Sequence, residues 1–461
     1  MDPSFPVSLS ALHFPSSEQQ SISQTLSALR RSALSVTNRL HSIETDAQFV
    51  AEVAAHYGLP LIANERCGSW YIDPAVKTGS VYFKSTDGHT GQWDFSFRRL
   101  NLQVLSIARE HGGCIIVDST RRGKLMPDSL SKTIPIWTAV LNRALFPDEP
   151  AMHSVQFPPN FLPESEESQI ERRIDSFVKS LTDLNLSLEA LKAQLQRPIR
   201  LAWANRAYFH PTTLLKNSEE YNLFVLCSAS KRVHGAEMSE GGYIQGAGDD
   251  SESWALGLTP PLFWEHKTEI LRRSEEDMPG FISSLLQQER GAKGEQGQAV
   301  RIAPTRNLFL GVTADVSGAG FDLVVDCNSK PEEQEPSDGD GKIGPKRLNL
   351  GCASAKLGSR DLRKHLDRVR AFVREHLSAN PETKLLICCE TGRDLSVGAL
   401  LAILCLFYDE DGNFCADERK SIGKQFIRQR LAWITLCKPD ANPSRSTLQS
   451  VNAFLMERPD Y

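Results

Sequence analysis

The feature that most constrains the fold lies near the C-terminus, where two apolar runs flank a short polar turn. KLLICC (384–389) has the length of a buried strand, and LSVGALLAILCLF (395–407) has the length of a buried helix. The turn between them, ETGRD, contains a glycine. This order predicts an α/β unit in which the loop lies at the carboxyl end of the strand and at the N-terminus of the helix.

A further helix is predicted just upstream. The pair Asn380-Pro381 predicts where that helix ends. Its apolar side is predicted from residues at helical spacing, namely Leu362, Leu366, Val369, Phe372, Val373 and Leu377.

One segment interrupts these patterns. NSKPEEQEPSDGDG (328–341) is rich in proline, glycine and acidic residues and has no apolar periodicity, which is typical of a linker. We therefore predict a large N-terminal domain at 1–327, an acidic linker at 328–344 and a C-terminal domain at 345–461.

Helical and strand patterns also alternate in the N-terminal part. Segments 17–57 and 164–195 have helical patterns. Short apolar runs predict four strands, GCIIVD (113–118), LFVLC (223–227), LFLGV (308–312) and FDLVVDC (321–327). The alternation predicts an α/β fold for this part too.

Composition excludes several classes of protein. No window holds the roughly 18 consecutive apolar residues of a membrane span, and the first residues lack the pattern of a signal peptide. The ten cysteines include no C-x-x-C pair, which argues against a disulfide framework or a zinc site and favours a reducing compartment. We therefore expect a cytoplasmic protein.

Charge is unevenly distributed. The net charge of −5 is not typical of a nucleic-acid-binding protein. Yet 98–143 holds eight Lys or Arg against three Asp or Glu, and 346–374 holds nine against two. Two such segments are consistent with local phosphate contacts and equally with two solvated helix faces.

The loop after Cys389 resembles the phosphate loop of the dual-specificity phosphatases, where Cys is followed by five residues, Arg, and Ser or Thr. Here the arginine position holds Leu395, although Arg393 could supply the charge, and 349–360 contains no candidate for the general acid. Because phosphate hydrolysis through a thiolate needs all three groups, we predict a phosphatase-like fold without the activity. A structural turn is the alternative to a phosphate site. The predicted phosphate-binding residues are Glu390, Thr391, Gly392, Arg393, Asp394, Leu395 and Ser396.

A second dense set of polar residues follows the strand predicted at 113–118. Asp118 is the candidate catalytic carboxylate and Mg²⁺ ligand, because carboxylates with neighbouring hydroxyls hold Mg²⁺ and ribose. An Arg-Arg-x-Lys run can hold a pyrophosphate or an RNA backbone, although a plain surface loop remains possible. The predicted substrate-binding residues are Ser119, Thr120, Arg121, Arg122, Lys124, Ser129 and Lys132.

Two further segments are candidates for binding. In 83–101, basic residues alternate with Trp93, Phe95 and Phe97, which suits RNA contact but fits a half-buried strand better. In 241–260, glycines permit close approach to a ligand, and Asp249 and Asp250 are alternative catalytic carboxylates unless the loop is simply solvated. The predicted tRNA-binding residues are Lys84, Arg98, Arg99, Lys346, Arg347 and Lys356.

Together these segments resemble one family, the initiator-tRNA ribosyl phosphate transferases. The resemblance is carried by FKSTDGHTGQWDFSFRRLN, VDSTRRGKLMPDSLSKTIPIW, YIQGAGDDSESWALGLTP, ETGRDLSVG and NPSRSTLQSVNAFLM, which spread over most of the chain. It implies a pentosyltransferase that moves ribosyl phosphate from phosphoribosyl pyrophosphate (PRPP) to the 2′-hydroxyl of a T-stem purine, nucleotide 64, of initiator tRNA. That modification keeps initiator tRNA out of elongation.

The resemblance also implies PRPP and initiator tRNA as partners, with Mg²⁺ accompanying PRPP. The usual PRPP signature is absent, so the loop that binds each phosphate stays open, as does the catalytic base. A phosphatase acting through Cys389 and a non-catalytic tRNA-binding protein are the competing hypotheses.

Overall fold

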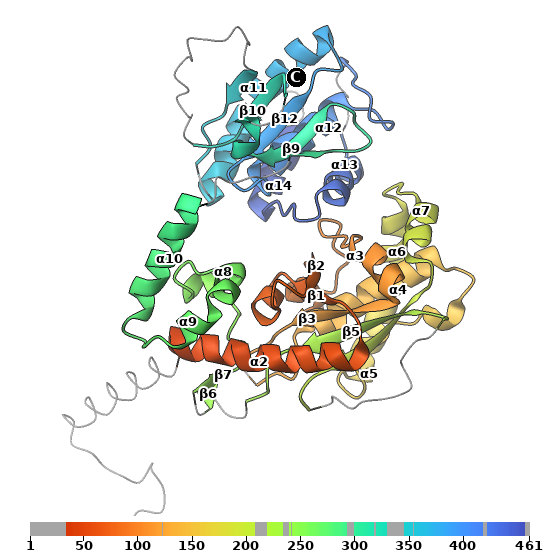
Figure 1. Cartoon of the computed structure of the whole chain (residues 1–461). Coiled ribbons are helices and arrows are strands. Elements are labelled where there is room, and N and C mark those ends of the chain that lie inside the picture. Colours follow the sequence, from red (N-terminus) through yellow and green to blue (C-terminus); the bar gives the residue numbers. More distant parts are fainter. Residues whose placement is uncertain are drawn as a thin grey trace, which may run out of the picture.

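The computed structural model describes residues 34–121, 123–207, 219–233, 239–240, 242–292, 299–317, 320–329, 345–353, 355–417 and 422–456. These residues form two α/β domains, each built on its own five-stranded sheet (Figure 1). The α/β class predicted for both parts is confirmed.

The first sheet is entirely parallel and has the order β2-β1-β3-β5-β4. Its strands are β1 (Leu61–Asn64), β2 (Lys77–Val81), β3 (Gly113–Asp118), β4 (Ile199–Ala204) and β5 (Asn222–Ser228). Every residue of β3 and β5 is buried, as expected for central strands covered on both faces. Because all five strands run the same way, their carboxyl ends meet at one edge.

Helices cover both faces of this sheet. Alternate residues of β3 face opposite ways, so Ile116 joins one apolar cluster and Val117 the other. One face carries α3 (Val104–His111), the π-helical turn η4 (Ser129–Thr133), α4 (Ile134–Leu145), α5 (Glu164–Glu171), α6 (Ile174–Thr182) and α7 (Leu188–Leu195). The other carries α2 (Val36–Tyr57), η2 (Gly68–Tyr71), α8 (Pro260–Glu265), α9 (Lys267–Leu271) and α10 (Met278–Ala292).

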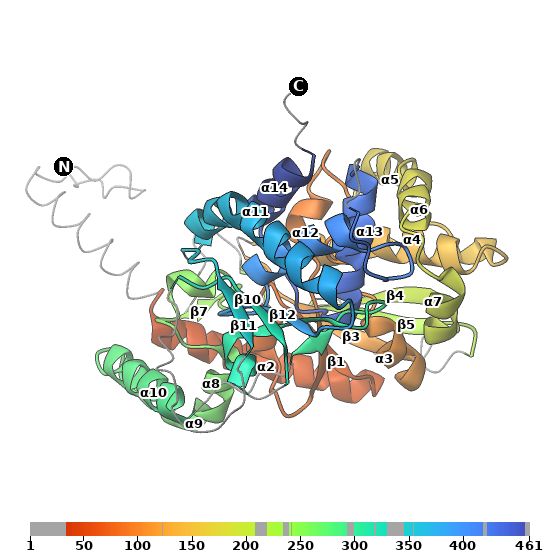
Figure 2. The same ribbon diagram turned by 90° about the horizontal axis from the view of Figure 1, so that it is seen from above.

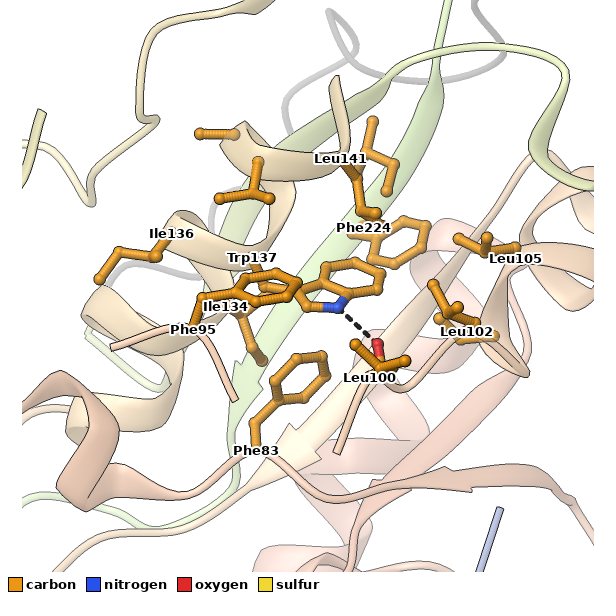
Figure 3. Close-up of a cluster of buried hydrophobic side chains, with 14 of the residues drawn as sticks. Phe83, Phe95, Leu100, Leu102, Leu105, Ile134, Ile136, Trp137, Leu141 and Phe224 are labelled. Atoms are coloured by element: carbon orange, nitrogen blue, oxygen red, sulfur yellow. Dashed lines mark hydrogen bonds between the residues drawn. The ribbon is translucent and has the colours of Figure 1, made fainter. Parts of the chain in front are cut away.

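Trp137 of α4 lies at the centre of the first cluster. Its indole nitrogen donates to the carbonyl of Leu100 at 2.7 Å, and its ring packs edge-on against Phe83 (Figure 3). The buried indole therefore fixes the 83–101 segment against α4 and satisfies its own donor.

The 83–101 segment differs from the expected strand. Residues 93–97 have no regular secondary structure, and only the short turn η3 (Ser85–Gly88) precedes them. Trp93 and Phe95 are nevertheless buried, because their rings fill the cluster around Trp137. The alternation of apolar residues predicted the burial of Trp93 and Phe95 correctly, but it predicted the wrong backbone conformation.

The second sheet has the order β11-β10-β12-β9-β8, with only β8 antiparallel. Its strands are β8 (Val300–Arg301), β9 (Leu308–Val312), β10 (Leu323–Asp326), β11 (Lys346–Asn349) and β12 (Leu385–Cys389). Helices α11 (Ala355–Ala379), α12 (Leu395–Phe407), α13 (Lys424–Cys437) and α14 (Arg445–Leu455) complete this domain. The strand–loop–helix unit predicted from 384–407 is therefore confirmed as its centre.

The predicted domain boundary is wrong. Strands β9 and β10 pair directly with β12, so the C-terminal domain begins before β8 and not at 345. The acidic linker falls inside this domain, between β10 and β11, and its residues 330–344 lie outside the described part of the chain. Residues 17–33 of the first predicted helix also lie outside it.

The two domains contact each other directly. Gln425 and Gln429 of α13 both donate to the carbonyl of Asp183, at 3.1 and 2.9 Å. Seen from above, α11 to α14 overlie elements of the first domain (Figure 2). In the described residues, no helix is long and apolar enough to cross a membrane.

Candidate active site

Asp118 ends β3 at the carboxyl edge of the first sheet and is completely buried. Its carboxylate accepts hydrogen bonds from Asn64 at 2.8 Å, from Cys67 at 3.1 Å, from Arg66 and from the hydroxyl of Ser129. The amide of Ser119 adds another at 2.7 Å. Five residues thus hold this side chain in one orientation.

Arg66 lies between two carboxylates. Its Nη2 is 2.9 Å from Asp118 and 3.2 Å from Asp249, and it also donates to the carbonyl of Ser119. Burial alone would lower the pKa of Arg66, but Asp118, then Cys67 and Asp249, raise it above its usual value. The guanidinium therefore carries a fixed positive charge at the sheet edge.

Sequence reasoning missed Arg66 and its neighbours Asn64 and Cys67. The four-residue strand LIAN is too short to give a clear periodic signal. The available clue is that Arg66 and Asp118 both follow apolar runs, and parallel strands place such residues at one edge.

The glycine-rich segment around 242–250 packs on the loop that follows β3. Gln245 accepts from the amides of Gly123 and Val233 and donates to the carbonyl of Lys124 at 2.7 Å. Gly246 has a φ of +67°, and a Cβ there would lie 2.8 Å from the carbonyl of Thr120. Only glycine allows this approach, which brings two separately predicted segments into one site.

The two acidic residues of this segment occupy different environments. Asp249 is buried beside Arg66, and burial, opposed by Arg66, raises the pKa of its carboxyl. Asp250 is exposed and pairs with Arg121. Asp249 therefore has the environment of a carboxylate that can take up a proton, whereas Asp250 orients a basic side chain.

Several predicted substrate-binding residues instead support the loop. The hydroxyl of Ser119 accepts from Tyr71 at 3.0 Å and lies 2.5 Å from Ser230. Thr120 is buried, and Ser129 is buried against Asp118. The hydroxyls of Ser119 and Ser129 are therefore bonded within the protein, and substrate binding by these three residues stays a prediction.

The basic residues of the loop also separate into two kinds. Lys132 is buried and pairs with Asp128 and Glu166 at 3.4 and 3.2 Å. Arg121 and Lys124 are 41% and 58% exposed, so their charges remain accessible to an anion. Arg122 lies outside the described residues.

Asp118 does not fit the predicted role of Mg²⁺ ligand. Both of its oxygens already accept from protein donors, and the side chain has no exposed surface. In the described residues, no group of three or more His, Cys, Asp or Glu is arranged to hold a metal ion.

The C-terminal loop keeps part of the phosphatase geometry. The Cys389 sulfur lies 3.0 Å from the hydroxyl of Ser396, and the loop joins β12 to α12 as predicted. Its glycine, Gly392, has a φ of +64° and packs against Gly311. Leu395, at the arginine position of the phosphatase loop, begins α12 and packs against the apolar core.

The polar groups of this loop are largely used within the protein. The amide of Glu390 donates to Asn328 at 2.7 Å, and that of Arg393 donates to Thr391 at 3.3 Å. The Arg393 guanidinium pairs with Asp440 at 2.9 Å, and Asp394 accepts from the amide of Ser444 at 2.8 Å. These bonds reduce the number of hydrogen-bond donors with which the loop could bind a phosphate.

The segment 440–444 links this loop to the first domain. The amide of Asn442 donates to the carbonyl of Arg393 at 2.9 Å, while its side-chain oxygen accepts from Arg99 at 2.5 Å. Arg98 donates to the carbonyl of Pro443 at 3.3 Å. The loop after Cys389 and the segment 83–101 are therefore connected through the domain junction.

The predicted tRNA-binding residues do not form one surface. Arg98 and Arg99 lie at the domain junction, where Arg99 also stacks on Tyr82 at 4.2 Å. Lys84 is near them, and its backbone carbonyl accepts a hydrogen bond from the hydroxyl of Thr133. Lys346 and Arg347 lie on β11, at an edge of the second sheet, and the side chain of Lys356 lies outside the described residues.

Fold and site define a two-domain α/β protein with a buried Asp–Arg–Asp cluster on the first sheet and a phosphatase-like loop on the second. The family model described as the Rit1 N-terminal domain matches residues 29–287, and the Rit1 DUSP-like domain matches 346–455. The chain belongs to the Rit1 family.

Two relatives match nearly the whole chain. An uncharacterised protein of Schizosaccharomyces pombe is 38% identical over 91% of this chain and 94% of its own length. The tRNA A64-2′-O-ribosylphosphate transferase of Saccharomyces cerevisiae is 34% identical over 95% of both chains.

Several solved structures of phosphatases cover about a third of this chain. Human DUSP28 is 20% identical, with a TM-score of 0.26 over 34% of this chain and 92% of that chain. The Yvh1 phosphatase domain of Chaetomium thermophilum is 16% identical, with a TM-score of 0.26 over 34% of this chain and 95% of that chain.

Proposed function

We propose that this protein transfers a ribosyl phosphate group from PRPP to the 2′-hydroxyl of nucleotide 64 of initiator tRNA, which blocks use of that tRNA in elongation. The observation that carries the proposal is the 34% identity, over 95% of both chains, with a protein named tRNA A64-2′-O-ribosylphosphate transferase. The charged cluster at the edge of the first sheet supplies groups suited to this chemistry.

The reaction is a substitution at the anomeric carbon of PRPP. The bond from that carbon to pyrophosphate breaks, and a bond from the carbon to the 2′-oxygen of the tRNA forms. The hydroxyl proton passes to a base, and pyrophosphate leaves with the bonding electrons. Positive charge develops on the ribose ring, by analogy with glycoside hydrolysis.

The leaving pyrophosphate needs cations. Arg121 and Lys124 follow β3 and are accessible, and Asp118 holds Arg66 rigidly at the same edge of the sheet. A preorganised cation stabilises developing negative charge without the cost of reorientation. Asp118 acts in this scheme as a positioning residue for Arg66.

Asp249 is the carboxylate best suited to accept the proton. Burial raises the pKa of its carboxyl, which increases its basicity toward a hydroxyl. We propose that Mg²⁺ accompanies the PRPP phosphates and that Asp118 is not one of its ligands, because both Asp118 oxygens accept from protein donors. Loss of product in excess EDTA, restored by Mg²⁺, tests that requirement.

The deciding experiment is mass spectrometry of initiator tRNA after incubation with the protein, PRPP and Mg²⁺. The expected product is a tRNA heavier by one ribosyl phosphate, located at nucleotide 64 by nuclease mapping. Bound but unmodified tRNA would favour a binding protein. Turnover of p-nitrophenyl phosphate that is lost in Cys389→Ser would favour a phosphatase.

All ten cysteines are free, and eight are buried. A reducing compartment suits such a chain, and we place the reaction in the cytoplasm.

A further inference from the structure

A basic groove runs along the junction of the two domains. It encloses a volume of about 440 Å³ and is open to solvent. One wall comes from 87–98 of the first domain, and the other from α13 and α14 of the second. Its charged lining residues are Arg98, Lys424, Arg428, Arg445, Asp87 and Asp94.

In the described residues, none of the four basic residues of this groove forms a close ion pair, although the charges of Arg98 and Arg428 oppose the rise in pKa that burial causes at Asp87 and Asp94. Most other lysines and arginines near the active site are paired, as Lys132 and Arg121 are. Four cations against two carboxylates leave the groove with positive charge that a bound anion would neutralise.

Arg428 is held in place by a stacking contact, and its charge also acts on the carboxylate of Asp94 without a close ion pair. Its guanidinium stacks on Phe97 at 5.1 Å, a contact between domains. Stacking fixes the plane of the guanidinium while leaving its N–H groups available for phosphate oxygens. Arg98 is similarly fixed by one bond to the carbonyl of Pro443.

The π-helical turn η4 connects the buried cluster to the segment that leads into the groove wall. Ser129, at one end of this turn, donates to Asp118, and Thr133, at the other, donates to the carbonyl of Lys84 at 3.1 Å. π-Helical turns of this kind are frequent at functional sites. Lys84 stands three residues before Asp87, where the groove wall begins, so η4 links the proposed reaction centre to that wall.

We propose that this groove binds the sugar-phosphate backbone of the tRNA stem that carries the acceptor nucleotide. The inference rests on the proposed function and adds the acceptor surface to it. The cations are solvent-facing and come from three separate elements, which suits consecutive backbone phosphates. A single small anion would instead be enclosed by convergent donors. Duplex RNA is recognised mainly through such backbone and shape contacts.

In this assignment the second domain serves as an RNA-binding element through α13 and α14, not through its phosphatase-like loop. Arg99, predicted from sequence to bind tRNA, has a different role. It donates to Asn442 across the junction, and burial, followed by the charge of Arg98, lowers the pKa of Arg99 to about 10. Arg99 therefore holds the domains together beside the groove.

The test uses the full chain with Arg428→Ala and Arg445→Ala combined. Both side chains are exposed, so the fold should survive, which a thermal melt checks. The control is Arg272→Ala, an exposed arginine at the end of α9 in the first domain. Binding of labelled initiator tRNA is measured at several salt concentrations, and binding of PRPP is measured separately by calorimetry.

We expect the double variant to bind tRNA about 10- to 100-fold more weakly, with a salt dependence reduced by about one unit of slope per lost phosphate contact. PRPP affinity and the Arg272→Ala variant should be unchanged. Lysine at both positions should restore part of the affinity, because the charge returns but the stacking of the Arg428 guanidinium on Phe97 does not.

Unchanged tRNA affinity in a folded double variant would overturn the proposal. So would a loss confined to PRPP, which would assign the groove to the donor. This test can be separated from the test of the proposed function. If the wild-type protein binds tRNA through the groove but forms no covalent product, the proposed transferase activity is wrong and the proposed tRNA-binding groove is still supported.

Discussion

Nη2 of Arg66 lies 2.9 Å from Oδ1 of Asp118, and this ion pair ties the loop after β1 to the end of β3. Asp118 has no exposed surface, whereas Arg66 is 23% exposed. The pair therefore presents a cation to the site edge while hiding the carboxylate that fixes it. This arrangement suits the stabilisation of a leaving anion better than it suits a metal ligand.

Replacing Asp118 should test whether its buried carboxylate holds Arg66 in place. Asp118→Asn leaves the buried side of Arg66 without its charge partner, and breaking a buried pair costs about 3–5 kcal/mol of unfolding free energy. Urea denaturation measures the loss. Asp250→Asn, at a 62% exposed carboxylate, should cost less than about 1 kcal/mol. Equal losses in the two variants would contradict a structural role specific to Asp118.

Asp249 should control how the transfer rate depends on pH. Because burial raises the pKa of its carboxyl, its ionised fraction grows with pH above the ordinary range of an aspartate. If Asp249 is the base, the single-turnover rate rises over the same range. Asp249→Asn should lose that rise and react on the order of 100-fold more slowly. A matching pH profile in both proteins would remove Asp249 from the chemistry.

Cys389 should be dispensable. Its sulfur contacts Ser396, while Leu395 occupies the position of the transition-state arginine. Cys389→Ser should keep transfer within about threefold of wild type, since no thiolate nucleophile is required. The wild-type protein should not hydrolyse p-nitrophenyl phosphate. Thiol-dependent hydrolysis in that assay would refute both expectations.

Arg393 distinguishes two roles of the C-terminal loop. If the loop binds a phosphate of PRPP, Arg393→Ala weakens PRPP binding by about 1.5–3 kcal/mol. We expect less than about 1 kcal/mol, because Arg393 pairs at the surface with Asp440 and the loop amides are used internally. Calorimetry with PRPP decides, and the larger loss would restore the phosphate-binding prediction.

Asp46 should make stability depend on pH. It is buried on α2, accepts from Tyr243 at 2.9 Å and lies 3.7 Å from Arg206. Burial raises the pKa of Asp46 to about 8, far above its unfolded value. The folded state therefore binds the extra proton between these values, and stability falls as pH rises toward 8.

Asp46→Asn removes that titrating group. The wild type should lose about 2 kcal/mol more unfolding free energy than the variant between pH 6 and pH 8. Urea denaturation at both values measures the difference. Parallel stability curves would show that the carboxyl stays ionised in the folded protein.

The sequence predicted long apolar elements well and their assignment to sheets poorly. β3, β9 and β12 coincide with runs of apolar residues, because a strand buried on both faces needs such a run. Which sheet a strand joins depends on distant partners, so β9 and β10 were assigned to the wrong domain. A disorder-like composition at 328–341 is equally compatible with a loop inside a domain.

The sequence predicted the acidic and basic loop residues of the candidate site, but it did not predict how they are arranged in space. Asp118 and Asp249 are far apart in sequence and meet through Arg66, which no motif identifies. The hydroxyls of Ser119 and Ser129 are of a kind that can bind a ligand, yet both are buried and form hydrogen bonds within the protein. Only tertiary packing separates these two uses of the same residue.

The contact between α13 and Asp183 has a consequence for how sequences can vary. Gln425 and Gln429 donate to the backbone carbonyl of Asp183, and Arg98 donates to that of Pro443. A carbonyl is present whatever residue occupies its position. At these three contacts the accepting positions are therefore free to change by mutation, whereas the two glutamines and the arginine must keep their side chains. Divergence at these contacts should be one-sided, unlike at the pairs Arg99–Asn442 and Arg428–Phe97, where both side chains take part.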